Sequence, residues 1–422
     1  MTSTNATTTT TTATTTSADS AATPRPGEVD LPTRSPLVGR LAVVAVMLGI
    51  FSIVTTEILP IGLLTTIGSS FAVSDGAAGL MMTMPGILAA VSAPVITVAT
   101  ARIDRRLMLC VFVLMLAGAN FLAAAAPGYW LVLLSRVVVG VVIGGFWSIG
   151  AGLAPRLVPA KSVGRANSVI FSAVPLGSVL GVPAGTFIGD LAGWRTTFVV
   201  LGAFAVGVLV LLLLVLPPLT PEQPTRLGVL RGMCKGVNTR FALLLTFLAV
   251  LAHFGAYTYL TPFLEQVTEA GSGLITVFLL VYGAAGIVGN FVGGAVVGRR
   301  PRVVFGVAAG MIAAVTLLLP VLGRWQVGAV ALLVVWGVAY GAVPISSQTW
   351  FAKATPHAPE AASVLFTASF QATISLGALA GGIIVDRTSP STVMTLGGLA
   401  ATLVVVAAWT HFARRLTWPD GA

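Results

Sequence analysis

Apolar residues along the chain form long runs that are separated by short polar segments. Twelve of these runs, at about 20 residues each, are long enough to cross roughly 30 Å of hydrocarbon as an α-helix. The predicted spans are 39–64, 76–99, 107–126, 130–154, 165–189, 196–216, 241–263, 274–297, 303–322, 327–350, 361–385 and 391–412. The pattern therefore predicts an all-α integral membrane protein with twelve transmembrane helices.

The longest internal connection, Pro217 to Arg240, divides the predicted spans into six and six. The two halves share short sequences, because "LGSVLG" begins at Leu176 in the fifth span and "LGALAG" begins at Leu376 in the eleventh. The basic loops "ARIDRR" and "GRRPR" likewise follow the second and the eighth span. Repeated six-helix halves are typical of secondary transporters, whose substrate site lies near the bilayer midplane between the halves. We therefore expect two pseudo-symmetric six-helix bundles.

Polar segments flank and connect these predicted bundles. Residues 1–36 form a Thr-rich tract without the apolar core of a signal peptide, so we expect a disordered cytoplasmic tail there. The bundles are predicted over 37–216 and 241–412, with a cytoplasmic linker over 217–240 and a second cytoplasmic tail over 413–422.

The distribution of lysine and arginine predicts which loops face the cytoplasm, because cytoplasmic loops are enriched in these residues. With the N-terminus inside, nineteen basic residues fall in cytoplasmic segments and three, Arg195, Arg324 and Arg387, fall outside. The remaining one, Arg136, lies within a span. We therefore expect a multi-pass protein of the plasma or inner membrane with both termini in the cytoplasm.

Composition supports a membrane protein and argues against several other functions. Hydrophobic residues make up 56% of the chain and charged residues 9%, against roughly 25% charged residues in an ordinary soluble domain. The mean hydropathy is +0.98. The net charge of +10 comes from short clusters between apolar runs and does not indicate nucleic-acid binding. Cys110 and Cys234 have the spacing of neither a disulfide framework nor a metal site.

The sequence does not contain a recognisable pattern of catalytic residues. The phosphate-binding sequence G-x-x-x-x-G-K-S/T is absent, and no cluster of Ser, His and Asp or of metal ligands stands out. We therefore expect no enzyme activity, no cofactor and no metal. The expected partners are a small-molecule substrate, protons and the lipid bilayer, and the chain is expected to act as a monomer.

Glu57, in "TTEILPIGLL", is the one acid of thirteen that lies well inside a predicted span. A carboxylate in hydrocarbon is costly, so such residues usually face a cavity, form a pair or take up a proton. Glu57 is therefore a candidate for proton coupling. The alternative is that its side chain reaches the outer interface, where Pro60 and Gly62 loosen the helix.

Arg136, in the fourth span, is the second unusual charge. At a rise of about 1.5 Å per residue it lies roughly 9 Å from the outer start of its span, and Glu57 lies roughly 25 Å from the inner edge of its own. Both therefore fall in the outer half of the membrane. The two side chains are predicted to interact directly or through water if the first and fourth helices touch. Otherwise Arg136 extends alone to the outer headgroups.

His253 lies near mid-depth of the seventh span, about 18 Å from Phe241 by the same rise. A cavity histidine binds substrate or relays a proton, because it titrates near neutral pH, whereas a buried histidine bonded to a neighbouring helix has only a structural role. Further candidates for a cavity lining are Trp147, Tyr257, Tyr259, Trp336, Tyr340, Gln348 and Gln371. For these residues the alternative is helix packing or the interfacial aromatic belt.

Glycines at every fourth position mark the fifth span, in "PLGSVLGVPAGTFIG". Gly177, Gly181 and Gly185 allow helix backbones to approach closely. Pro175 and Pro183 each remove a backbone hydrogen bond and favour a kink. Close packing accounts for part of the pattern, and a hinge between inward-open and outward-open states is the functional interpretation.

Four stretches of the chain, in the first, fourth, fifth and seventh predicted spans, carry recognisable sequence motifs. "TTEILPIGLL" has an acid, Glu57, in the first span, and "HFGAYTYLTPFLEQVT" begins the seventh-span motif at His253. "RVVVGVVIGGFWSIG" begins at Arg136, and "GSVLGVPAG" begins at Gly177. With these motifs the whole chain from about residue 37 to 412 resembles the major facilitator superfamily, in its twelve-helix drug:proton antiporter group near the arabinose- and sugar-efflux-like branch.

The resemblance implies roles for particular residues. Glu57 is at the acidic position of the first-helix signature, and Arg136 corresponds to the fourth-helix arginine that is implicated in proton transfer. Gly181, Pro183 and Gly185 form the core of the fifth-helix motif that marks antiporters.

The loop after the second span departs from that family's pattern, which runs Gly, two residues, Ala, Asp, Arg, then Gly-Arg-Arg. Here "TVATARIDRRL" has Thr97 for the first glycine and Ala101 for the aspartate. The candidates for a gating loop that remain are Arg102, Arg105 and Arg106. The missing aspartate puts the family's charge latch in question, and Asp104 is a candidate substitute.

The resemblance implies a secondary transporter that exports a drug, sugar or other small metabolite in exchange for protons, by alternating access. This function would place the protein in multidrug resistance or sugar efflux, with the proton gradient as the energy source. On this hypothesis, protonation of Glu57 from outside weakens its hold on Arg136. The alternatives are a facilitator or proton-symport importer with the same fold, and a membrane sensor that transports nothing.

Overall fold

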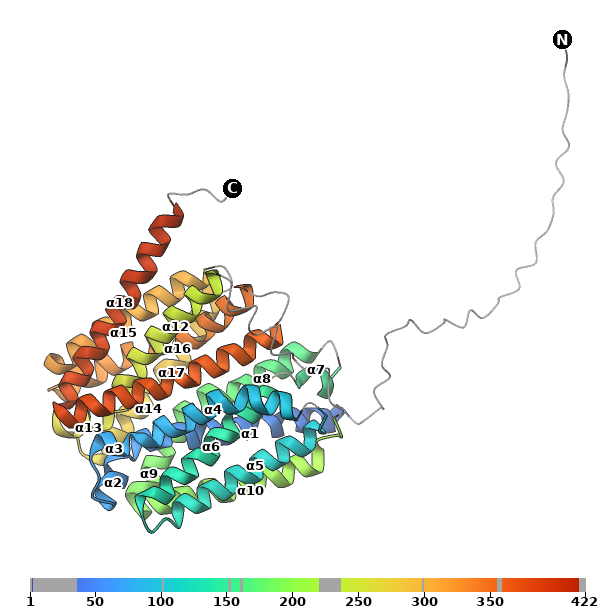
Figure 1. Cartoon of the computed structure of the whole chain (residues 1–422), viewed down its shortest axis with the longest axis horizontal. Helices are drawn as coiled ribbons and strands as arrows, with labels where there is room; N and C mark the ends of the chain where they lie inside the picture. The colour runs from blue at the N-terminus through green and yellow to red at the C-terminus, as the bar shows by residue number, and fades with distance from the viewer. Residues whose placement is uncertain are drawn as a thin grey trace. The chain divides into compact units, whose positions relative to one another are not determined.

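The computed structural model describes Thr2 and residues 36–100, 102–150, 153–159, 162–219, 237–297, 300–354 and 359–416. All regular secondary structure in these residues is helical, and the helices pack within one unit, Pro36–Ala422 (Figure 1). The predicted N-terminal tail apart from Thr2 and Pro36, and residues 220–236 of the predicted linker, lie outside the described residues.

The described helices of the first half include five long enough to span a membrane and several shorter ones. They are α1 (Pro36–Gly62), α2 (Leu64–Ser70), α3 (Asp75–Ala78), α4 (Leu80–Ala99), α5 (Arg105–Ala124), α6 (Tyr129–Gly150), α7 (Ala154–Leu157), α8 (Val163–Leu176), the π-helix η2 (Gly177–Gly181), α9 (Val182–Ala192) and α10 (Trp194–Val215).

The second half has a similar set in its described residues. They are α12 (Val237–Tyr257), α13 (Leu260–Gln266), α14 (Ser272–Val297), α15 (Pro301–Leu322), α16 (Gln326–Ala354), α17 (Pro359–Arg387) and α18 (Pro390–Leu416). Several boundaries differ from the predicted spans by a few residues; α12 begins at Val237 ahead of 241, α16 continues to Ala354 beyond 350, and α18 continues to Leu416 beyond 412. Hydropathy marks the part of a helix that lies in hydrocarbon, and polar residues continue the helix beyond it.

Eleven of the described helices are long and apolar enough to cross a membrane, and the count is twelve if the bent pair Arg165–Val174 and Val179–Ala192 forms one span. The prediction of an all-α membrane protein is therefore confirmed. Large apolar side chains cover the outer surface of the unit, where Leu214, Phe291 and Val327 are 77%, 73% and 79% exposed. Such side chains suit contact with acyl chains, because lipid carries no penalty for exposed apolar surface.

The bend in the fifth predicted span measures 41° and coincides with η2. A proline removes a backbone hydrogen bond, and π-turns form where the regular ladder is interrupted. The glycines here face α1, because a Cβ at Gly181 would overlap Thr55 and one at Gly185 would overlap Leu59. The four-residue spacing thus brings η2 and α9 close against the side chains of α1, while the role of this bend as a hinge stays a prediction.

The packing within each half differs from the packing between the halves. One apolar cluster contains residues of the first half alone, from Ala42 to Leu219. A second cluster is built on the second half and includes Ile61, Met82 and Val182 of the first. The halves meet where α17 lies alongside α4 (Figure 1) and where α14 contacts η2 and α9. This boundary passes through the level of Glu57.

Candidate functional site

The Glu57 side chain lies at the boundary between the two halves. It projects from α1 and is only 7% exposed. Its Oε1 atom accepts a hydrogen bond of 2.8 Å from Nε2 of Gln371, which lies on α17 of the other half. Glu57 therefore does not reach the outer interface as an isolated side chain, which was the alternative from the sequence. A buried carboxyl is instead held by an amide that comes from the opposite bundle.

Arg136, on α6, is fully buried beside the residue that precedes Glu57. Its Nη1 atom donates a hydrogen bond of 2.9 Å to the carbonyl oxygen of Thr56, and its guanidinium lies 5.1 Å above the ring of Phe198. Its Nη2 atom has no hydrogen-bond partner among the described residues. The first and fourth spans therefore touch at this level, but the guanidinium bonds to the α1 backbone and the carboxyl bonds to Gln371.

Asn120 belongs to the same buried layer and was not identified from the sequence. Its Nδ2 atom donates to Oγ1 of Thr56 at 3.2 Å and to the carbonyl oxygen of Leu116 at 3.0 Å. An asparagine inside the third apolar span was the available signal, but its neighbours on another helix are not readable from local sequence. Together Asn120 and Arg136 bond to both the side chain and the backbone of Thr56, and thus hold α1 against α5 and α6.

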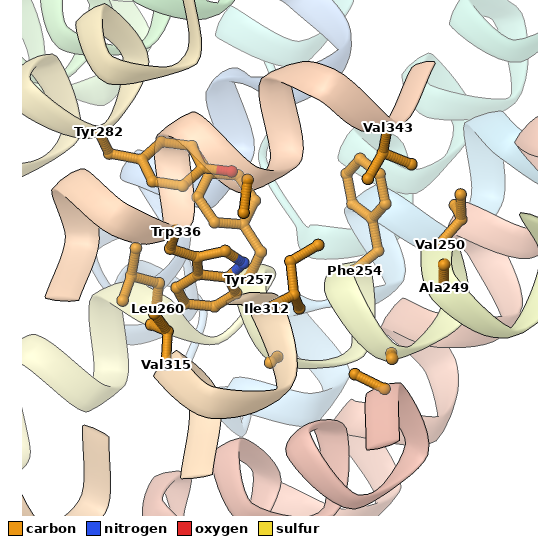
Figure 2. Close-up of a cluster of buried hydrophobic side chains, with 14 of the residues drawn as sticks. Ala249, Val250, Phe254, Tyr257, Leu260, Tyr282, Ile312, Val315, Trp336 and Val343 are labelled. Atoms are coloured by element: carbon orange, nitrogen blue, oxygen red, sulfur yellow. The ribbon is translucent and has the colours of Figure 1, made fainter. Parts of the chain in front are cut away.

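His253 lies in a packed group of aromatic side chains in the second half, not in open space. Figure 2 shows three of its neighbours, Tyr257, Tyr282 and Trp336, grouped within the buried cluster. The imidazole is 0% exposed and stacks on Tyr340, with ring centroids 3.5 Å apart and planes at 4°. Tyr257 stacks at 5.2 Å.

The hydrogen bonds of His253 define where its proton lies. Nε1 of Trp336 donates to Nδ1 at 3.0 Å, and an indole nitrogen is a donor only. Nδ1 is therefore the acceptor, so the imidazole is neutral and carries its proton on Nε2, which lies 3.5 Å from the Tyr282 hydroxyl. Of the two interpretations from the sequence, a histidine bonded to a neighbouring helix is the one that this geometry matches.

The remaining cavity candidates are distributed over both halves. Tyr340 is partly exposed and stacks on His253, so it belongs to the aromatic group. Trp147, on α6, pairs with Phe171 at 6.3 Å between ring centroids. The side chain of Gln348 lies outside the described residues. Glu57 and Gln371 are thus brought together, while Tyr340 belongs to the aromatic group and Trp147 has a separate aromatic neighbour.

The loop after the second span is fastened to the end of α10 within its own half. Oδ1 of Asp104 accepts from the backbone N–H groups of Arg106 at 2.7 Å and Leu107 at 3.2 Å, which caps α5. Oδ2 accepts from the N–H of Leu219 at 2.9 Å, and the N–H of Arg105 donates to the carbonyl oxygen of Leu219 at 3.0 Å. Asp104 therefore caps α5 and bonds to the backbone at the start of the predicted linker, while its role as a substitute for the family's charge latch stays a prediction.

The three arginines of this loop differ in their side-chain contacts. The Arg106 guanidinium donates to the carbonyl oxygen of Leu213 on α10, and Nη1 of Arg105 donates to the carbonyl oxygen of Thr100 at 3.1 Å. Arg102 is exposed. The gating role of all three arginines stays a prediction.

A set of carboxylates joins the halves at the end of the unit where α1 finishes, and the sequence did not reveal it. Asp386 accepts from the hydroxyl of Ser74 at 2.7 Å and from the N–H of Gly76 at 2.8 Å. Asp75 accepts from Nε2 of Gln266 at 3.2 Å, and Glu265 accepts from the Thr65 hydroxyl at 2.8 Å. We call these residues the clasp: Thr65, Ser74, Asp75, Gly76, Glu265, Gln266 and Asp386.

Comparisons with known proteins agree with this architecture. The family model described as Major Facilitator Superfamily matches residues 46–371. The chain is 32% identical over 383 residues to a protein of Pseudomonas aeruginosa named "Transcription regulatory protein OpdE", and the match covers 90% of this chain and 95% of that protein.

Two solved structures share the fold. A bacterial homolog of the human lysosomal transporter Spinster, in an inward-facing and unoccupied conformation, has a TM-score of 0.69 and 16% identity, covering 92% of this chain and all of that chain. The human organic anion transporter MFSD10 has a TM-score of 0.63 and 16% identity, covering 89% of this chain and all of that chain. With the family model matching most of its length, the chain belongs to the Major Facilitator Superfamily.

Proposed function

We propose that the protein is a secondary active transporter that exports a small organic solute in exchange for protons. The observation that carries this proposal is the buried carboxyl of Glu57 between the two halves, hydrogen-bonded to Gln371 of the opposite half. An ionisable group buried at membrane depth usually marks an ion or proton pathway. Here the same group also contacts the element that must move when one half rocks against the other.

The orientation follows from the positive-inside distribution, which puts the N-terminus in the cytoplasm. The clasp then lies at the outer surface and closes it in the conformation described. When the clasp opens, Glu57 becomes accessible to protons from outside, and neutralising its charge weakens its hydrogen bond from Gln371. Release of the proton inside restores the charge. This replaces the expectation that Glu57 holds Arg136, because Arg136 bonds to Thr56.

The substrate is proposed to bind beside Glu57, against the partly exposed Tyr340 and with Gln371 at the boundary. Trp147 is the candidate substrate-contacting residue of the first half. The drug:proton antiporter and sugar-efflux-like motifs support a drug, a sugar or a metabolite as the class of solute. His253 is proposed to fix the position of the Tyr340 ring by stacking on it.

The test is proton movement in proteoliposomes that contain a pH-sensitive dye, on addition of a panel of dyes, antibiotics and sugars. The wild type is expected to couple at least one compound to proton flux, and Glu57→Gln is expected to lose that coupling while it inserts normally. Glu269→Gln is the matched control, because Glu269 is an exposed acid. Full coupling in Glu57→Gln would refute the proposal.

Two other functions are separated by related measurements. A facilitator or proton-symport importer of the same fold would not accumulate solute in everted vesicles when a proton gradient is imposed, whereas an exporter would. A membrane sensor is favoured by one observation, the name of the relative OpdE, which is called a transcription regulatory protein. A sensor would bind a compound from the panel without any flux of that compound.

A further inference from the structure

Gln371 has an unusual set of contacts for a buried amide. It is 6% exposed, its Nε2 atom donates to Glu57, and its Oε1 atom has no hydrogen-bond partner among the described residues. A primary amide carries both donors and an acceptor, whereas an ionised carboxylate accepts only. Gln371 can therefore serve Glu57 in either protonation state, by donating to the carboxylate or by accepting from the carboxylic acid.

The backbone that carries Gln371 is pressed against α4 of the first half. A Cβ added at Gly86 would lie 2.5 Å from the Gln371 carbonyl oxygen and would overlap the Ser375 hydroxyl. That hydroxyl donates to the same carbonyl oxygen at 3.1 Å. The amide reaches Glu57 from a backbone position that depends on contact between α17 and α4. Separation of these helices therefore removes the donor from the carboxylate.

We propose that Gln371 is a positioning residue that links the protonation state of Glu57 to the contact between α17 and α4. This inference rests on the proposed function of Glu57 in proton coupling. A hydrogen bond to an ionised acceptor is about twice as strong as one between neutral groups, so the contact is stronger while Glu57 is ionised. Protonation weakens it and favours separation of the helices. By linkage, the joined conformation favours the ionised form to the same extent.

Few other titratable groups bear on Glu57. Arg136 on α6 bonds to the neighbouring Thr56, and Tyr340 on α16 is within electrostatic range. The other described titratable side chains on elements that pack against α1 lie within two turns of the helix ends, as Glu265 does on α13 and Asp190 on α9. On α17, which carries Gln371, Asp386 likewise lies near the end of the helix. The amide is thus the one described side chain that bonds directly to the carboxyl.

The test measures the pH profile of substrate-driven proton flux in proteoliposomes for Gln371→Leu. Without the amide donor the ionised carboxyl loses stabilisation, so the midpoint of the profile is expected to move to higher pH by about one to two units. Gln326→Leu is the matched control, since Gln326 is an exposed amide at the start of α16 and belongs neither to the clasp nor to the surroundings of Glu57. Its midpoint is expected to stay unchanged.

An unchanged midpoint in Gln371→Leu would overturn the inference. If Gln371→Leu fails to insert, Gln371→Glu is measured by the same criterion, because two carboxyls that share one proton also move the midpoint to higher pH. Loss of coupling in Glu57→Gln with an unchanged Gln371 profile would remove this inference and leave the proposed function standing. Full coupling in Glu57→Gln would remove both.

Discussion

The hydrogen bonds of the clasp allow an estimate of how strongly one carboxylate holds that end of the unit closed. Replacing Asp386 with Ala removes two hydrogen bonds to the first half, from the Ser74 hydroxyl and from the Gly76 N–H. Because Asp386 is exposed, each bond is assigned the ordinary net value and not the larger value for buried charged groups, which gives about 1–2 kcal/mol for the pair. The population open at this end is then expected to rise by about fivefold to thirtyfold.

A thiol-labelling rate measures this change. Ile61→Cys, in a background without Cys110 and Cys234, places a thiol where the side chain is fully buried and packs into the apolar cluster of the second half. Its reaction with a membrane-impermeant maleimide requires opening of the clasp, so the rate follows the open population when opening is fast. Asp386→Ala is expected to raise the rate by the same fivefold to thirtyfold.

The control for this experiment is Asp190→Ala. Asp190 is the corresponding acid near the end of α9 in the first half, and it is exposed. Its removal is expected to leave the labelling rate within twofold of the parent. If Asp386→Ala changed the rate by less than twofold, or if both variants changed it equally, the clasp would not hold the closed state.

Two further variants test the packing of the site. Gly181→Val is expected to destabilise the purified protein by about 1–3 kcal/mol through overlap with Thr55, as measured by thermal unfolding in detergent. Gly207→Val is the control, because an added Cβ there meets nothing within 4 Å, and it is expected to leave the stability unchanged. His253→Phe is expected to cost about 1–3 kcal/mol because the buried indole N–H of Trp336 loses its acceptor. In the His253→Phe background, Trp336→Phe is expected to lower the stability less than it does in the wild type. Equal losses of stability in the two backgrounds would contradict the assigned hydrogen bond.

The sequence was sufficient for the membrane fold and for the two unusual charges. Apolar runs determine which segments cross the bilayer, because every backbone polar group in lipid must be satisfied within its own helix. Glu57 and Arg136 stood out for the same reason, since charges are costly there. Their presence at one level was predictable from a constant rise per residue, and the bond from Arg136 to Thr56 agrees with it.

The sequence was not sufficient for the partners of these residues. Gln371 is 314 positions from Glu57, and Ser74 is 312 positions from Asp386. Such pairs depend on how the halves dock, and neither propensity nor periodicity encodes that. His253 illustrates the same limit, because an isolated histidine in an apolar run is equally compatible with a cavity and with a packed core. Its contacts with Trp336 and Tyr340 decide between them.

The contacts within the first half differ in kind from the contacts between the two halves. Within the first half, a continuous apolar cluster and close glycine contacts hold the helices, and separating them would expose large apolar surface. Between the halves, the apolar contacts are accompanied by hydrogen bonds from side chains, such as those of Glu57, Asp75 and Asp386. Each exposed bond of the clasp contributes only about 0.5–1.5 kcal/mol net, because water replaces a lost partner, whereas the bond to the ionised Glu57 carboxyl contributes about 1.5–3 kcal/mol. Protonation of Glu57 or the binding of one solute molecule changes one part of this balance and so shifts the populations of the joined and open arrangements.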